Sequence, residues 1–164
     1  MINTNELVKW LRSIDKKLHR KTTLIAIGGT AMTLLGLKSS TRDVDFCLKS
    51  DEKKDFEKVL GKKFKVDIFT DGYIFSEQLP VDYSEKSKEI VRMKNIALKA
   101  LDPIDIIITK AARFNARDEE DIQVLSKHVN RDELVKRFNE VLKSYSGKEE
   151  DYKYHIKIIL KRFF

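Results

Sequence analysis

Two aspartates separated by one apolar residue are the clearest chemical feature of the sequence. Asp43 and Asp45 flank Val44 in an alternating run that predicts a strand over residues 43–48. Side chains two residues apart in a strand project from the same face, so we expect both carboxylates to point to one place. Carboxylate oxygens suit Mg²⁺ or Mn²⁺, with phosphate oxygens completing the shell. The alternative interpretation is the solvent-facing side of an edge strand.

A glycine pair at a predicted strand-to-helix junction is a candidate phosphate-binding turn. A β-branched run over residues 23–27 leads into Gly28, Gly29 and Thr30, and a short helix is expected from Thr30 to Leu35. Without Cβ atoms the glycines let backbone amides approach a ligand closely, and a helix N-terminus favours an anion. Such a pair is also an ordinary feature of turns, so this motif alone decides nothing.

Asp67 supplies a third carboxylate. It stands between two apolar residues in an alternating run over residues 66–69, and we expect this strand to pair with the strand that carries Asp45. Three acids on two adjacent strands, facing a glycine turn, are the arrangement of two-metal phosphoryl-transfer sites. Each feature is ambiguous by itself, whereas their conjunction favours chemistry on phosphates.

The composition bounds the class of protein. The chain has 164 residues, of which 41% are hydrophobic and 36% charged, which is globular composition with room for a core. No apolar run approaches the roughly 20 residues that cross a bilayer, and charged residues interrupt any signal-peptide pattern at the N-terminus. The single cysteine, Cys47, excludes an internal disulfide and a Cys-rich zinc site, and we expect it to be buried and inert. These features predict a cytoplasmic domain with no membrane partner.

The charge balance has two interpretations. With 33 Lys and Arg against 26 Asp and Glu, the net charge is +7, and it is spread over the whole chain. A diffuse positive charge favours a polyanion such as RNA. A solvated surface rich in Lys and Glu, as thermophilic proteins use, explains the same numbers.

The expected elements divide the chain into an α/β part and a helical part. Asn3 and Glu6 form a plausible cap for a first helix, and Asp51 is expected to cap another helix that runs to Leu60. Residues 71–87 are expected to be irregular. The remaining predictions are a hairpin over residues 89–101 and helices over residues 103–116, 119–128, 131–145 and 149–163. We therefore predict an α+β fold in which an α/β core with a short mixed sheet, residues 1–101, is followed by a helical C-terminal region, residues 102–164, packed on it as one unit.

The order of the motifs resembles the signature of the polymerase-β-like nucleotidyltransferases. That signature is an apolar residue followed by Gly and Gly or Ser, a short spacer, Asp-apolar-Asp/Glu-apolar, and a later Asp between apolar residues. The corresponding segments here are Ile27-Gly28-Gly29, a spacer over residues 30–42, Asp43-Val44-Asp45-Phe46 and Val66-Asp67-Ile68. The resemblance covers roughly residues 23–69.

This resemblance implies an enzyme that moves a nucleoside monophosphate from an NTP such as ATP to a hydroxyl, with Mg²⁺ or Mn²⁺. It implies that Asp43 and Asp45 bind the metal that holds the triphosphate. Asp67, with one or both of them, would bind a second metal and assist deprotonation of the acceptor hydroxyl.

The phosphate contacts follow from the same resemblance. The amides of Gly28 and Gly29, with the Thr30 hydroxyl, would hold the phosphates of the nucleotide. Arg42 could reach a phosphate or merely balance the neighbouring acids.

The sequence after the core is similar to the AbiEii/MenT-like branch of toxin-type nucleotidyltransferases, in which a helical Lys precedes an Arg-Asp…Asp-apolar segment. Here these are Lys110 and residues 117–122. The resemblance implies that Lys110 neutralises charge on the phosphates and that an antitoxin-like protein is a possible partner. Asp121 could orient Lys110 or the acceptor, although a carboxylate on the helix surface is the more ordinary interpretation.

Other functions fit the sequence less well. Haloacid-dehalogenase-type phosphatases need a hydroxyl residue where Cys47 stands, and glycosyltransferases with an Asp-x-Asp generally need a larger nucleotide-binding domain. The main alternative is a non-catalytic protein that binds a nucleotide or a partner on the same fold. Since Asp43, Asp45 and Asp67 are all present, we favour the enzyme. A tRNA or other RNA 3′ end, a protein hydroxyl and a small molecule remain open as acceptors.

Overall fold

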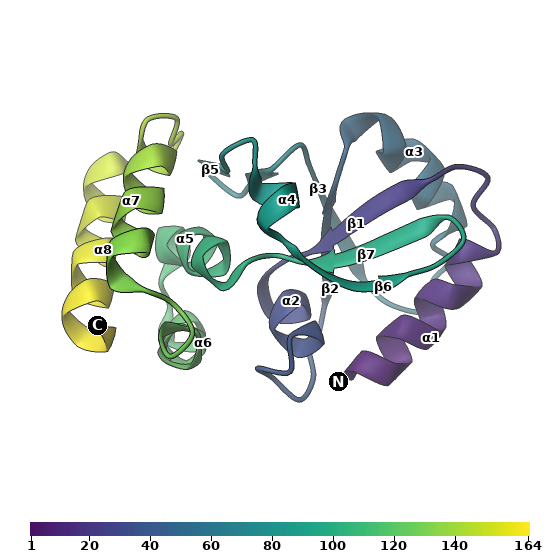
Figure 1. Ribbon diagram of the computed structural model, residues 1–164, viewed down its shortest axis with the longest axis horizontal. Coiled ribbons are helices and arrows are strands. Elements are labelled where there is room, and N and C mark those ends of the chain that lie inside the picture. Colours follow the sequence, from purple (N-terminus) through teal and green to yellow (C-terminus); the bar gives the residue numbers. More distant parts are fainter. The chain divides into compact units, whose positions relative to one another are not determined.

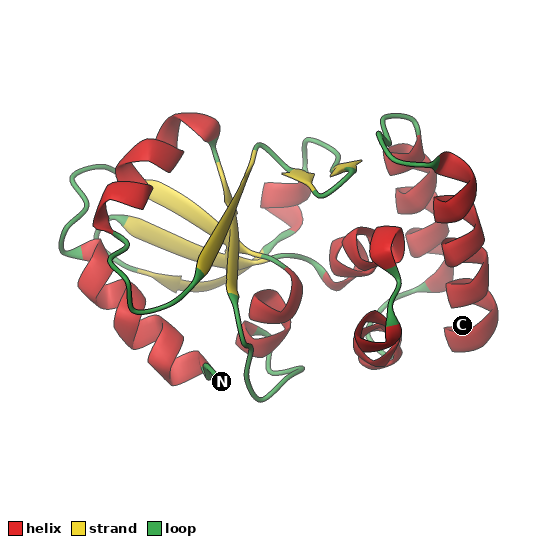
Figure 2. Ribbon diagram, turned by 180° about the vertical axis from the view of Figure 1, so that it is seen from behind, coloured by secondary structure: helices red, strands yellow, loops and turns green.

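The computed structural model describes residues 1–164 and has an α+β fold, as predicted. By its internal contacts the chain divides into two units, which we describe separately. The first comprises Met1–Asp71 and Ser84–Leu101, and the second comprises Gly72–Tyr83 and Asp102–Phe164. Figure 1 labels the elements, and Figure 2 shows one unit rich in strands and one made mostly of helices. Residues 72–83, which we had grouped with the sheet, thus belong by their contacts to the helical unit.

The first unit is built on a mixed sheet. Its strands follow the order β3-β2-β1-β7-β6. Strand β2 runs antiparallel to β1, whereas β3 runs parallel to β2 and β7 runs parallel to β1. The elements are α1 (Thr4–Asp15), β1 (Thr22–Ala26), α2 (Gly28–Leu34), β2 (Val44–Leu48), α3 (Ser50–Val59), β3 (Val66–Thr70), β6 (Lys88–Arg92) and β7 (Ile96–Ala100).

The helices of this unit begin where local side chains satisfy their first amides. The Asn3 side chain accepts a hydrogen bond from the Glu6 amide, and Glu6 reaches back to the Asn3 amide, so the predicted capping box of α1 is confirmed. The prediction that Asp51 caps α3 is wrong, because α3 starts after Lys49 and Asp51 lies in its first turn. There its carboxylate still favours the helix N-terminus electrostatically.

Apolar side chains of both helices cover the sheet and form the core. Leu7, Leu11 and Ile14 on α1 are completely or almost completely buried. Phe56 of α3 packs edge-to-face against Phe46 of β2, with ring centroids 6.1 Å apart. Phe46 faces α3, so the residues that alternate with it along β2, including Asp45, project from the other face of the sheet.

The second unit is helical, with a small hairpin. Helix α5 lies at its centre and contacts α6, α7 and α8. The buried Tyr152 donates a hydrogen bond to the Ile108 carbonyl, 3.0 Å away, and stacks on Tyr145. The elements are β4 (Tyr73–Ile74), β5 (Glu77–Gln78), α5 (Pro103–Arg113), α6 (Ala116–Ser126), α7 (Arg131–Leu142) and α8 (Glu149–Phe163), and α4 (Tyr83–Lys86) stands where the chain leaves this unit. None of the helices combines the length and the apolar character that crossing a membrane requires.

Candidate functional site

Strand pairing brings two of the three predicted aspartates side by side. In the parallel ladder between β2 and β3, Asp45 stands directly opposite Asp67. Residues at paired positions project from the same face of a sheet, and both side chains here are half-buried. The predicted pairing of the two acidic strands is therefore confirmed. Asp67 also forms an ion pair with the exposed Lys65, with 3.6 Å between Nζ and Oδ2.

The glycine turn lies against the Asp45 carboxylate. Strand β1 leads through Ile27, whose amide donates to the Asp45 carbonyl at 3.1 Å, into Gly28 at the start of α2. Gly28 has φ +52°, a left-handed conformation that glycine adopts without strain. A Cβ atom on Gly28 would lie only 3.8 Å from Asp45 Oδ2. The absence of a side chain therefore leaves the space beside this carboxylate open.

The Thr30 hydroxyl holds the backbone of the acidic segment, residues 43–45. It donates to the Asp43 carbonyl at 3.1 Å and accepts from the Asp45 amide at 3.0 Å. Thr30 is completely buried. Because its hydroxyl holds both ends of the Asp43–Asp45 segment, Thr30 positions this segment, and the phosphate contact that the resemblance implies stays a prediction.

Thr41 is a positioning residue that sequence reasoning missed. Its hydroxyl donates to the same Asp43 carbonyl at 3.0 Å, and its backbone pairs with Ile2. A Cβ atom on Gly29 would stand only 3.0 Å from Thr41 Oγ1, so this position favours glycine for lack of space. The signal in the sequence is a hydroxyl residue two positions before the first aspartate, close enough along the chain to donate to the carbonyl of that aspartate.

Asp43 and Arg42 lie at the accessible edge of this arrangement. Both are exposed, and neither side chain makes a hydrogen bond or an ion pair. No three Asp, Glu, His or Cys side chains gather closely enough to form a complete metal cluster. The structure thus brings Asp45 and Asp67 together, with Asp43 two residues upstream at the start of β2.

Lys110 and Asp121 meet in the second unit. The Lys110 ammonium lies 2.7 Å from Asp121 Oδ2 and 3.3 Å from Asp118 Oδ1. Asp121 is only 6% exposed, so the interpretation as a helix-surface carboxylate is wrong and the alternative that it orients Lys110 fits the geometry. Lys110 is equally buried.

Asp118 is the centre of this ion-pair network, and sequence reasoning gave it no role. Arg113 donates to both of its carboxylate oxygens, at 2.9 and 2.8 Å. Burial raises the pKa of the Asp118 carboxyl, but the hydrogen bonds from Arg113 and the charge of Lys110 together bring this pKa below its ordinary value. Asp118 is therefore ionised and holds both cations in place.

A comparison with protein families decides what kind of chain this is. A family model described as "Nucleotidyltransferase of unknown function (DUF6036)" matches residues 4–163. The chain belongs to this nucleotidyltransferase family. Comparisons with curated proteins and with solved structures gave no match. The resemblance to nucleotidyltransferases is thus confirmed at the level of the family, and the closer resemblance to the AbiEii/MenT-like branch stays a prediction.

The carboxylates of this nucleotidyltransferase fit a divalent cation. Mg²⁺ is commonly held by one or two carboxylates together with phosphate oxygens of the substrate, rather than by a complete cage of protein ligands. Asp45 and Asp67 provide two such carboxylates at paired positions, next to a glycine that leaves room for a ligand. The donor set consists of hard oxygens. Cys47, two residues after Asp45 on the same face of β2, is completely buried, as expected.

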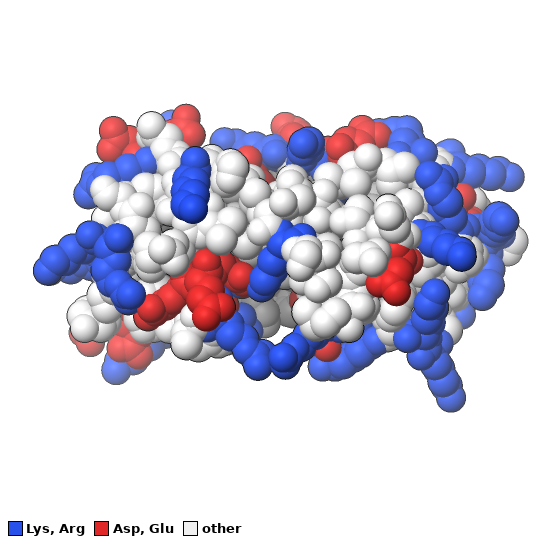
Figure 3. Space-filling view, turned by 90° about the horizontal axis from the view of Figure 1, so that it is seen from below, with Lys and Arg blue, Asp and Glu red and all other residues white.

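The surface charge of this family member is diffuse. On the face drawn in Figure 3, Lys and Arg side chains are spread among acidic and neutral ones and do not form one continuous patch. The net charge of +7 is therefore not concentrated on this face. Both interpretations of the charge, RNA binding and a solvated surface, remain compatible with this view.

Proposed function

We propose that the protein is a metal-dependent nucleotidyltransferase that moves a nucleoside monophosphate from an NTP to a hydroxyl acceptor. One observation carries the proposal: Asp45 and Asp67 stand side by side next to the Gly28 turn, in a chain that belongs to a nucleotidyltransferase family. In the reaction, the acceptor oxygen forms a bond to the α-phosphorus while the bond from that phosphorus to the leaving pyrophosphate breaks.

Each acidic residue has a distinct role in this proposal. Asp43 and Asp45 bind the cation that accompanies the triphosphate, because they share one short segment where β2 begins. Asp67 accepts the proton of the acceptor hydroxyl. A bound Mg²⁺ would supply charge neutralisation for the phosphates and lower the pKa of the attacking hydroxyl.

The remaining residues position the acids and the phosphates. The hydroxyls of Thr30 and Thr41 hold the Asp43 carbonyl, so the acidic segment stays fixed while a charged ligand arrives. The amides of Gly28 and Gly29 approach the phosphates. Lys110 is paired with Asp121 and Asp118 within its own unit, and its contact with a phosphate stays a prediction.

RNA is the acceptor that we propose first. The support is the net charge of +7, since a basic protein attracts a polyanion over long distances. A protein or small-molecule hydroxyl would use the same residues. Binding of an RNA acceptor should weaken steeply with salt, because the contact displaces counterions.

Calorimetric titration tests the proposal. Each of the four NTPs is titrated with Mg²⁺ into the wild type, Asp43→Asn and Asp45→Asn, and Asp132→Asn serves as the control because this aspartate is 93% exposed on α7. We expect one NTP to bind with Mg²⁺, and we expect this binding to be lost in the first two variants only. Equal binding in all four proteins would overturn the assignment of the cation site.

The main alternative is a non-catalytic protein that binds a nucleotide or a partner on this fold. A transfer assay with an α-labelled NTP separates the two. Label that appears on RNA or protein, and that disappears with Asp67→Asn, supports the enzyme. Tight NTP binding without any labelled product supports the binding protein.

A further inference from the structure

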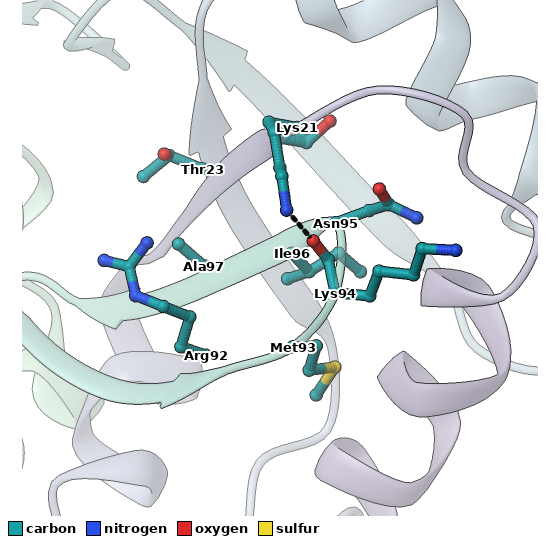
Figure 4. A pocket seen from close by; sticks show the side chains of 9 residues that line it. Lys21, Thr23, Arg92, Met93, Lys94, Asn95, Ile96 and Ala97 are labelled. Atoms are coloured by element: carbon teal, nitrogen blue, oxygen red, sulfur yellow. Dashed lines mark hydrogen bonds between the residues drawn. The ribbon is translucent and has the colours of Figure 1, made fainter.

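A cavity with cationic residues in its lining lies in the first unit, at the end of β1 opposite to the glycine turn. It has a volume of about 250 Å³ and is formed by the start of β1 and by the β6–β7 hairpin. Three cationic residues, Lys21, Arg92 and Lys94, line it, and no carboxylate does. Figure 4 shows the Lys21 and Arg92 side chains with Ala97 between them and the Lys94 ammonium directed away.

Strand register explains how this cavity forms. Thr23 of β1 and Arg92 of β6 are both paired with Ala97 of β7, so the three residues form one row across the sheet. Their side chains share one face because paired positions project to the same side. Ala97 contributes only a methyl group, which leaves a depression between the two longer side chains.

The cationic groups in the cavity are oriented and retain free donors. Glu89 accepts from Arg92 Nε at 2.8 Å and from one terminal nitrogen at 3.2 Å, which fixes the guanidinium by one edge. The second terminal nitrogen keeps its donors for another ligand. The Lys21 ammonium donates to the Lys94 carbonyl, which occupies one of its three protons. The Thr23 hydroxyl makes no hydrogen bond and adds a third donor.

Another cavity of this unit provides a comparison, because acidic residues accompany its cationic residues. That cavity, about 430 Å³ in volume, is lined by Arg20 and Lys58 among others, but also by Asp55. The Arg20 guanidinium is paired with Asp51 and Asp55, at 3.3 and 3.5 Å. Arg20 thus has two carboxylate partners, whereas Arg92 has one, Glu89, and the Lys21 ammonium has none.

We propose that the cavity of Lys21, Thr23 and Arg92 binds the phosphate group of a ligand other than the NTP. An oriented guanidinium, an ammonium and a hydroxyl around a small depression match the several acceptor oxygens of a phosphate. The volume exceeds that of a phosphate alone, so part of the molecule that bears the phosphate also fits. A small phosphorylated molecule and the backbone of a nucleic acid offer the same chemistry.

This site is separate from the proposed NTP site. Thr23 in β1 and Ile27, in extended conformation just after it, lie four residues apart, which at about 3.3 Å per residue is roughly 13 Å. The completely buried Cys47 and the almost completely buried Ile25 lie between the two ends on that face. The proposal therefore does not depend on the metal-dependent reaction and can hold when that reaction fails.

Phosphate titration without divalent cations tests the site. Inorganic phosphate and a short single-stranded oligonucleotide are added separately to the wild type, and amide chemical shifts are followed by NMR. We expect saturable shifts at Thr23 and Ala97. The double variant Lys21→Ala/Arg92→Ala should bind either probe roughly tenfold to a hundredfold more weakly, because it removes charge-assisted hydrogen bonds.

Arg20→Ala is the matched control, since it removes one cation from the adjacent cavity. It should leave phosphate affinity within about twofold, because Arg20 lines only the other cavity and makes no part of the one that contains Lys21 and Arg92. An equal loss of affinity in Arg20→Ala and Arg92→Ala, or shifts that never saturate, would overturn the proposal in favour of diffuse charge. Tighter binding of the oligonucleotide than of phosphate would identify a nucleic-acid backbone as the ligand, and equal binding a small phosphorylated molecule. Unchanged thermal unfolding of both variants confirms that they fold.

Discussion

The acidic clusters of the two units differ in how far they are buried. In the first unit, Asp43 is exposed, Asp45 and Asp67 are half-buried, and Asp67 forms an ion pair with an exposed lysine. In the second unit, Asp105 and Asp118 are almost completely buried, and each is held by two hydrogen bonds from an arginine. Acids that bind a cation must stay accessible, whereas acids that hold helices together must be buried with their partners.

This difference teaches which substitutions should affect activity and which should affect stability. Removing the cation from a buried ion pair strongly lowers the free energy of unfolding, because the remaining carboxylate is neither paired nor solvated. Accessible acids on one edge of a sheet repel each other, so removing one charge relieves repulsion in the unliganded protein. The contrast between the units can be tested directly.

The largest expected effect is on catalysis. Asp45→Asn should lower the rate of nucleotidyl transfer by roughly a thousandfold or more, because it removes a ligand of the cation that the proposed reaction requires. Its free energy of unfolding should stay the same or rise slightly. Transfer assays and denaturant unfolding measure the two quantities. The contrast is contradicted if Asp45→Asn lowers the free energy of unfolding and leaves the transfer rate unchanged.

The next effect is on the stability of the helical unit. Arg137 donates to both oxygens of Asp105 and to Asp82. Arg137→Met should lower the free energy of unfolding by about 3–5 kcal/mol, since it leaves the Asp105 carboxylate buried without its cation. Denaturant unfolding gives the value. Arg131→Met is the control, because Arg131 forms only an exposed pair with Asp132, and it should cost less than about 1 kcal/mol.

Glu77 is an exception within the helical unit and predicts a pH dependence. It is completely buried, and neither carboxylate oxygen has a hydrogen-bond partner. Burial raises its pKa from 4.5 to about 8, so the folded state retains a proton that the unfolded state releases. The free energy of unfolding should therefore fall as the pH rises from about 4.5 to about 8, by up to roughly 1.4 kcal/mol per pH unit.

Unfolding of Glu77→Gln across this range measures the contribution of Glu77. In this variant the free energy of unfolding should fall much less as the pH rises, and at pH 8 it should exceed that of the wild type. Glu85→Gln, at an exposed position, should keep the slope of the wild type. Parallel curves for the wild type and Glu77→Gln would show that Glu77 does not cause the decline.

The smallest effect concerns the glycine turn. Gly28→Ala should cost about 1–2 kcal/mol, because alanine resists the left-handed conformation at φ +52°. Gly36→Ala is a matched control, since Gly36 has φ +73° and no atom within 4 Å of an added Cβ. Both variants should lose similar stability in thermal unfolding. Only Gly28→Ala should weaken binding of an NTP with Mg²⁺, because its methyl group would stand beside Asp45.

The sheet and the pairing of its acids were predictable because local patterns determine them. Alternation of apolar and polar residues over two short runs predicts two half-buried strands, and their pairing places Asp45 opposite Asp67. The cap of α1 was predictable for the same reason, since Asn3 and Glu6 contact each other within one turn. Patterns of this kind depend only on neighbouring residues.

Features that depend on distant residues were not predictable. The hairpin of β4 and β5 lies in a segment expected to be irregular, and it is anchored by hydrogen bonds from Ser146 to the Ser76 carbonyl. No local pattern encodes a contact across 70 residues. The burial of Asp121 likewise follows from the packing of α6 against α5, which brings its carboxylate to Lys110.

The discontinuous course of the chain has a consequence for how the protein is made. The helical unit consists of Gly72–Tyr83 and Asp102–Phe164. The segment Ser84–Leu101, which contributes β6 and β7 to the sheet, is synthesised between these two parts. Because Arg137 binds Asp82 and Ser146 binds Ser76, the early segment leaves the ribosome well before its partners exist. The sheet unit can thus be completed first, and residues 102–164 expressed alone would lack a part of their own fold.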